Sequence, residues 1–94
     1  PCILLRDAAP DAFTIVTKVN DEVRQDASTE EFIFPIPSLI STLSQGTTLQ
    51  PGDIISTGTP SGVGAGFKPP RYIHSGDTVE ISISSIGTLK NTVK

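Results

Sequence analysis

The stretch of this sequence best suited to chemistry is residues 57–66, TGTPSGVGAG, which we call the glycine-rich loop. It holds three hydroxyl side chains among four glycines. Glycines let backbone N–H groups approach a ligand closely, and hydroxyl groups add further hydrogen-bond donors. Because clustered N–H and O–H donors suit an anionic oxygen, the sequence predicts a carboxylate- or phosphate-binding loop here. The alternative is a flexible connection between two strands.

Other motifs that carry chemistry are missing from the sequence. The glycine-rich loop lacks the Gly-Lys-Ser/Thr ending of a Walker A loop and the G-x-G-x-x-G spacing of a dinucleotide site. His74 is the only histidine, and beside a turn we interpret it as a surface residue. No His, Cys or carboxylate cluster has the spacing of metal ligands. Glu30 and Glu31 are better explained as part of a helix start.

Composition narrows the class of protein. The chain has 94 residues, no Met and 36% apolar residues, which is little for a self-sufficient core at this length. Its net charge of −3 argues against nucleic acid and against an anionic membrane surface as partners. Cys2 is the only cysteine and the longest apolar run is short, so neither a disulfide scaffold nor a membrane span is expected. We expect a cytoplasmic location, with a mitochondrial one as the alternative.

Two strands joined by a tight turn should precede the glycine-rich loop. Residues 13–19 alternate between apolar and polar side chains, which predicts a strand. Asn20-Asp21 is a candidate two-residue hairpin turn, and residues 22–25 would return beside the first strand. The sequence Ser-Thr-Glu-Glu at residues 28–31 has the form of a capping box.

A short helix and further strands complete the predicted elements. Apolar residues at helical spacing predict a short helix; they are Ile36, Leu39, Ile40 and Leu43. Pro37 is tolerated in its first turn, and Gly46 can close it. We expect this helix to cover the sheet edge or one of its faces. Strands are predicted at residues 54–57, 79–83 and 88–93, with Gly-Asp turns before the first two. Residues 58–71 form a long loop between them.

Three segments resemble the fumarylacetoacetate hydrolase family. Residues 19–25, VNDEVRQ, resemble its V-N-G-E-x-R-Q hairpin, and residues 32–37, FIFPIP, resemble its M-I-F-S-I-P segment. Residues 48–64, TLQPGDIISTGTPSGVG, are similar to its signature T-L-x-P-G-D-I-I-x-T-G-T-P-x-G-V-G. The order and spacing agree from about residue 13 to residue 93.

The resemblance implies a mostly-β fold with one short helix, part of the family's mixed β-roll. Residues 1–94 would be the C-terminal portion of one catalytic domain whose N-terminal portion is absent. The family's enzymes are usually dimers that cleave carbon–carbon bonds in small β-keto or acylpyruvate dicarboxylic acids, decarboxylate oxaloacetate-like acids, or isomerise related dienoates. A divalent ion, Mg²⁺ or Ca²⁺ or Mn²⁺, stabilises the enolate in these reactions.

The same resemblance implies which residues of this chain bind substrate. The family's carboxylate ligands, catalytic lysine and lid residues lie upstream, so no catalytic or metal-binding residue is expected within this chain. Thr59 matches the threonine that contacts a substrate carboxylate, and Gly58 and Thr57 accompany it. The sequence departs from the family at three positions outside this loop, with Asp21 for Gly, Phe32 for Met and Pro35 for Ser, and Pro35 removes the expected N-cap of the helix.

Three hypotheses remain open. The first is the acid-binding portion of a metal-dependent hydrolase or decarboxylase, with a dienoate isomerase or oxaloacetate tautomerase as its variant. The second is a non-catalytic β module that has lost its catalytic half and assembles with a partner. The third is an unrelated small barrel with similar Gly-Asp turns, which the fold alone can distinguish.

Overall fold

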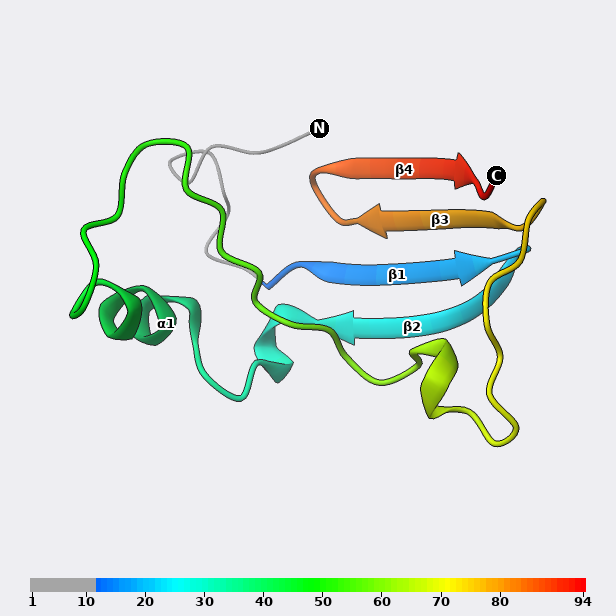
Figure 1. Ribbon diagram of the computed structural model, residues 1–94, viewed down its shortest axis with the longest axis horizontal. Helices are drawn as coiled ribbons and strands as arrows, with labels where there is room; N and C mark the ends of the chain where they lie inside the picture. The colour runs from blue at the N-terminus through cyan, green and yellow to red at the C-terminus, as the bar shows by residue number, and fades with distance from the viewer. Residues whose placement is uncertain (1–11) are drawn as a thin grey trace.

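A computed structural model describes residues 12–94, which form a four-stranded sheet with one α-helix beyond its end (Figure 1). The strands are β1 (Thr14–Val19), β2 (Glu22–Ser28), β3 (Thr78–Ile83) and β4 (Gly87–Thr92). Their order across the sheet is β2-β1-β3-β4, and every pair is antiparallel. The predicted class, mostly β with one short helix, is therefore confirmed. Cys2 lies outside the described residues.

The turn between β1 and β2 confirms the predicted two-residue hairpin. Asn20 and Asp21 have φ angles of 51° and 65°, the left-handed values that such turns require. Asn20 also fastens this turn to the start of β3, because its amide donates to Asp77 Oδ1 (2.8 Å) and its Oδ1 accepts from the Thr78 N–H (2.9 Å). The β1–β2 hairpin is thus joined to β3 both by strand pairing and by the side chain of its turn residue Asn20.

The capping box at the end of β2 is confirmed, and it starts a single turn of 3₁₀-helix, η2 (Thr29–Glu31). The Ser28 side chain accepts from the Glu30 N–H at 3.2 Å, and Glu31 Oε1 accepts from the Ser28 N–H at 2.9 Å. These reciprocal bonds satisfy donors that the turn would otherwise leave free. They end β2 and turn the chain toward the helix.

Helix α1 (Ile36–Leu43) forms where the apolar stripe predicted it, with Pro35 as an N-cap that makes no side-chain bond. Two details of the prediction are wrong. The helix ends at Leu43 with Ser44 as its C-cap in a right-handed conformation, so Gly46 does not close it. The helix also lies beyond the strand ends rather than over the sheet (Figure 1), because the irregular chain before it leads away from β2.

The strand predicted at residues 54–57 is absent from the described structure, where these residues are extended but unpaired. A strand requires a neighbour for its N–H and C=O groups, and no described strand pairs with this segment. Ile54 is 95% exposed as a result. The preceding turn did form as predicted, with Gly52 at a φ of 98°.

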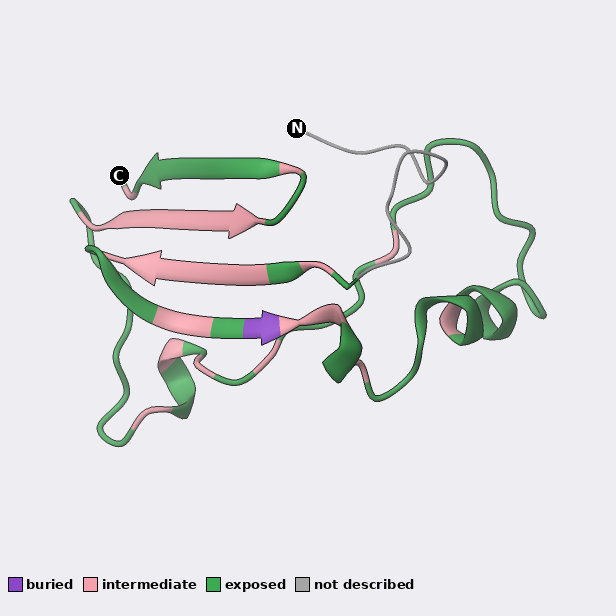
Figure 2. Cartoon of the chain, turned by 180° about the vertical axis from the view of Figure 1, so that it is seen from behind, coloured by how far each residue is buried: buried purple, intermediate pink, exposed green. Residues whose placement is uncertain are grey.

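The predictions for the last two strands are confirmed to within a residue or two by β3 and β4. Apolar burial is small nonetheless, since Ala27 on β2 is the only buried residue of the described part of the chain (Figure 2). Within residues 12–94 no helix has the length and apolar character needed to cross a bilayer.

Candidate functional site

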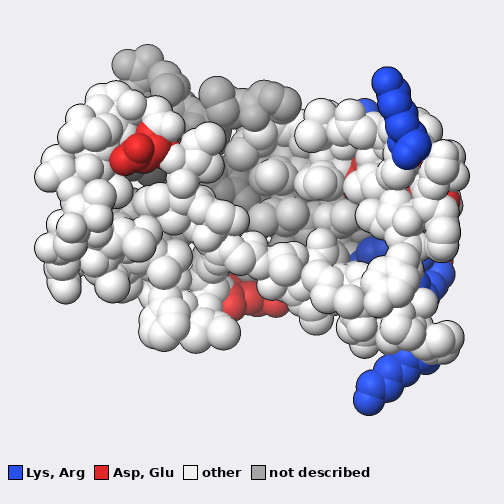
Figure 3. Space-filling model, in the orientation of Figure 1, with Lys and Arg blue, Asp and Glu red and all other residues white. Residues whose placement is uncertain are grey.

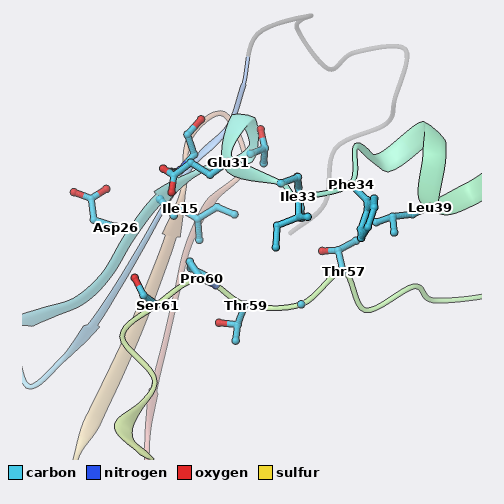
Figure 4. A pocket seen from close by; sticks show the side chains of 15 residues that line it. Ile15, Asp26, Glu31, Ile33, Phe34, Leu39, Thr57, Thr59, Pro60 and Ser61 are labelled. Atoms are coloured by element: carbon cyan, nitrogen blue, oxygen red, sulfur yellow. Dashed lines mark hydrogen bonds between the residues drawn. The ribbon is translucent and has the colours of Figure 1, made fainter. Parts of the chain in front are cut away.

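The glycine-rich loop lines one side of a cavity of about 550 Å³, a volume in the range of small-molecule sites. Its residues 57–61 face side chains from the end of β2, from η2 and from the segment that leads into α1. Figure 4 shows Ile33, Phe34 and Leu39 on one side and Thr57, Thr59 and Pro60 on the other. The cavity therefore combines an apolar wall with a hydroxyl-bearing edge.

The three residues predicted to bind substrate are brought together at this edge, since Thr57, Gly58 and Thr59 all line the cavity. Gly58 has a φ of 97°, which a residue with a Cβ rarely adopts. A Cβ on Gly58 would meet nothing within 4 Å, so the space beside the chain is open. Thr57 and Thr59 thus lie on either side of a residue that has room next to it.

The hairpin motif, residues 19–25, holds the glycine-rich loop through its last three polar side chains. Glu22 accepts two hydrogen bonds of 2.6 Å from the Arg71 guanidinium, just beyond the loop. Arg24 and Arg71 both lie over the Phe67 ring, each with its guanidinium carbon 5.3 Å from the ring centroid. These cation–π contacts join β2 to the chain that follows the loop.

The third side chain, Gln25, reaches the loop itself. Its Nε2 donates to Thr59 Oγ1 at 2.8 Å and to the Pro60 carbonyl oxygen at 3.0 Å. Gln25 was not among the residues predicted from sequence. The signal that could have found it is the Arg-Gln pair at the end of the hairpin motif, although nothing local indicates a partner 34 residues away.

Two glycines of the loop are held close to other backbone. A Cβ on Gly62 would overlap the Arg24 carbonyl oxygen, and Gly62 has a φ of 106°. A Cβ on Gly64 would overlap the Arg71 carbonyl oxygen, while the Arg71 N–H donates to the Gly64 oxygen at 2.8 Å. The second half of the loop is therefore packed against β2 and residue 71, not a flexible connection, and the 3₁₀ turn η3 (Gly64–Gly66) lies within it.

The basic side chains of the described residues lie away from the larger cavity. The Arg71 guanidinium holds the pKa of Glu22 below its usual value through their hydrogen bonds. Figure 3 shows Lys and Arg side chains at the end of the molecule opposite α1. Among the described residues that line the cavity there is no Lys or Arg, so the side-chain hydrogen-bond donors of its lining are neutral.

Two carboxylates, Asp26 and Glu31, also line the cavity. Glu31 is engaged by the capping box, and the Asp26 carboxylate points away from the other labelled side chains (Figure 4). Within residues 12–94 no three His, Cys, Asp or Glu side chains gather where they could hold a metal ion. The donor set of the described residues therefore does not fit the divalent cation that the resemblance implies.

His74 and Asp77 form a turn rather than a site. The His74 side chain is 79% exposed, as expected for a surface residue, while the His74 backbone N–H donates to Asp77 Oδ2 at 2.8 Å. The Asn20 amide, followed by this His74 N–H, holds the pKa of Asp77 below its usual value. Both contacts serve the turn that starts β3.

Comparison with known proteins places this geometry in a family. The family model of the C-terminal domain of fumarylacetoacetate (FAA) hydrolase matches residues 1–94. The chain is 55% identical over 84 residues to oxaloacetate tautomerase YisK of Bacillus subtilis, and this match covers 89% of the chain and 28% of that protein.

Solved structures agree. Fumarylacetoacetate hydrolase from Exiguobacterium antarcticum matches with a TM-score of 0.88 and 44% identity over 93% of this chain and 31% of that one. Maleylpyruvate hydrolase from Sphingobium sp. SYK-6, in complex with manganese(II) and pyruvate, matches with a TM-score of 0.82 and 41% identity over 97% of this chain and 33% of that one. The chain spans about a third of the length of these relatives, and it belongs to the fumarylacetoacetate hydrolase family.

Proposed function

We propose that this chain is the acid-binding portion of an enzyme that cleaves or decarboxylates small β-keto or acylpyruvate dicarboxylic acids. The observation that carries the proposal is the cavity edge formed by residues 57–61, where hydroxyl groups and a glycine with open space beside it face an apolar wall. A few polar groups set in an apolar pocket are typical of a small-molecule site. Thr59, Gly58 and Thr57 would donate hydrogen bonds to one carboxylate of the substrate.

Neutral donors alone would leave most of a dicarboxylate's charge uncompensated. A hydrogen bond to a charged group contributes about 1.5–3 kcal/mol, so one or two of them give only weak binding. The positive charge would come from a divalent cation, Mg²⁺ or Ca²⁺ or Mn²⁺, held by residues outside this chain. Such a cation supplies Lewis-acid stabilisation of an enolate. The maleylpyruvate hydrolase that contains manganese and pyruvate supports this assignment.

The described lining of the cavity lacks a positive charge to balance a dicarboxylate, and the chain spans only about a third of the length of its relatives. We infer that residues 1–94 are the C-terminal portion of a longer subunit, which forms a homodimer. Relatives about three times as long support the longer subunit. Large apolar side chains such as Ile33 and Ile54, at 88% and 95% exposure, are surfaces that the rest of the subunit or a second copy would cover. The catalytic residues would then lie outside this chain.

A tautomerase or dienoate isomerase is the second candidate, favoured by the 55% identity to the Bacillus tautomerase. The same carboxylate-binding edge would serve either reaction, because both require a fixed 2-oxo acid and a stabilised enolate. The two candidates differ in their products: tautomerisation leaves the carbon skeleton intact, whereas decarboxylation or hydrolysis releases a smaller acid.

The test is an activity panel on the purified full-length subunit with Mg²⁺ or Mn²⁺. Oxaloacetate and an acylpyruvate are incubated with it, the enol and keto forms are followed by ultraviolet absorbance, and released pyruvate is measured separately. Chelator-sensitive release of pyruvate supports the hydrolase or decarboxylase. Enol–keto conversion without release supports the tautomerase. Absence of any turnover would contradict both and favour the non-catalytic β module.

A further inference from the structure

An irregularity in the sheet determines which side chains face the glycine-rich loop. The pairing of β1 with β2 shifts between Thr17 and Lys18: Thr17 pairs with Gln25, and Lys18 pairs with Val23. Arg24 is therefore one extra residue on β2, a β-bulge. Bulges redirect side chains next to functional sites, and here Arg24 and Gln25, although consecutive, line the same smaller cavity of about 240 Å³ beside the loop.

The orientation of the Gln25 amide follows from its two partners. Pro60 offers only a carbonyl oxygen, which can only accept, so the group 3.0 Å from it must be the NH₂ of Gln25. The same nitrogen lies 2.8 Å from Thr59 Oγ1. Because an amide NH₂ has no lone pair to offer, Thr59 Oγ1 must be the acceptor in that contact.

This contact leaves the Thr59 hydroxyl in a defined state. A hydroxyl has one hydrogen to donate and two lone pairs, and the Gln25 amide occupies a lone pair. The hydrogen therefore remains for another acceptor, and Thr59 lines the larger cavity. The loop cannot slide along β2 to break this arrangement, because Gly62 already lies against the Arg24 carbonyl oxygen.

We propose that Gln25 is a positioning residue: it occupies the acceptor side of the Thr59 hydroxyl, so that the hydroxyl donates its hydrogen to a carboxylate bound in the larger cavity. The proposal rests on the proposed function, because that function supplies the carboxylate. It predicts that Gln25 acts on the ligand only through Thr59. Gln25 itself is not among the described residues that line the larger cavity.

Three variants of the full-length subunit test it. Gln25→Met removes the amide at similar length, and we expect kcat/KM to fall about threefold to tenfold, mostly as a higher KM. In a Thr59→Val background the same change should have about a twofold effect or less, because the coupled hydroxyl is already gone. Gln45→Met is the matched control, since Gln45 is exposed beyond α1, and it should behave like the wild type.

Gln25→Glu separates positioning from simple attachment of the loop. At neutral pH the new carboxylate can only accept, so it takes the Thr59 hydrogen for itself and repels the substrate carboxylate. We expect a further loss of about tenfold relative to Gln25→Met. Protonation restores a donor, so activity relative to wild type should recover as the pH falls through about 4.3, the ordinary pKa of a glutamate side chain. A side chain that only attached the loop would lower the melting temperature without this pH-dependent recovery.

The readouts are steady-state kinetics on the panel above and calorimetric titration of the full-length subunit with pyruvate as the probe. If Gln25→Met weakens pyruvate binding in the wild-type background but not in the Thr59→Val background, the inference is supported. This holds even if no substrate is turned over, and in that case only the proposed function fails. Normal kinetics and normal pyruvate binding by Gln25→Met would overturn the inference and leave the proposed function intact. Equal losses in both backgrounds would also overturn it. Absence of pyruvate binding together with absence of turnover would overturn both.

Discussion

The two ends of this molecule are built differently. At one end the hairpin motif and the glycine-rich loop are joined by the Glu22–Arg71 pair, the stack on Phe67 and the Gln25 contacts. At the other end, α1 and residues 54–57 expose large apolar side chains, with Ile36, Ile40 and Leu43 between 43% and 47% exposed. One end is therefore held by polar and cation–π contacts, whereas the other end exposes apolar side chains, as the proposed function would require of a portion of a larger subunit.

The strongest way to test this comparison is to isolate the chain. Residues 1–94 expressed alone should show no turnover of oxaloacetate or acylpyruvates with or without Mg²⁺, because the described residues form no cluster that could hold the cation. They should also fold poorly, since Ala27 is the only buried residue between residues 12 and 94. Activity assays and thermal melts of the 94-residue chain check both. Chelator-sensitive turnover, or a sharp cooperative melt of a monomer, would show that the described residues suffice.

A second prediction breaks the close contact between the loop and β2. Gly62→Ala places a Cβ against the Arg24 carbonyl oxygen and forces a side-chain residue to a φ of 106°. We expect a loss of about 3 kcal/mol or more in the free energy of unfolding, measured by urea denaturation of the full-length subunit.

Gly46→Ala is the matched control at the opposite end of the molecule. A Cβ on Gly46 meets nothing within 4 Å, and its φ is not positive. This variant should lie within about 0.5 kcal/mol of wild type. Similar stabilities for the two variants would contradict the account of a tightly held loop.

The smallest effect concerns the ion pair at the ordered end. Because Arg71 lowers the pKa of Glu22 below its usual 4.5, the pair stabilises the fold above that value and loses its contribution as the pH falls through the lowered pKa. Glu22→Gln should therefore lower the melting temperature slightly at neutral pH, and the difference from wild type should vanish in acid. A difference that persists well below pH 4.5 would have another cause.

Local signals in the sequence were sufficient for most of the elements. Asn20-Asp21 determines its own turn, the capping box needs only residues 28–31, and alternation alone predicted β3. The strand predicted at residues 54–57 depends on a neighbour that is not among the described residues, so its apolar pattern was misleading. The placement of α1 depends on the irregular chain before it, which no periodicity indicates.

The candidate site likewise contains residues that local sequence signals indicate and one that they do not. Residues 57–59 could be selected from the glycines and hydroxyls around them and from the family resemblance. Gln25 could not, because its role depends on a bulge at Arg24 and on a loop that follows 34 residues later. Contacts of this kind can be identified only when the sheet register is known.

The measurement that tests the central claim most directly is the kinetics of Thr59→Val in the full-length subunit. The change keeps the β-branched shape and removes the hydroxyl donor. We predict that kcat/KM falls about tenfold to a hundredfold, since a hydrogen bond to a charged group contributes about 1.5–3 kcal/mol, while the affinity for the divalent cation and the melting temperature change little. Unchanged kcat/KM together with a lower melting temperature would show that Thr59 only stabilises the loop, and would contradict its assignment to substrate binding.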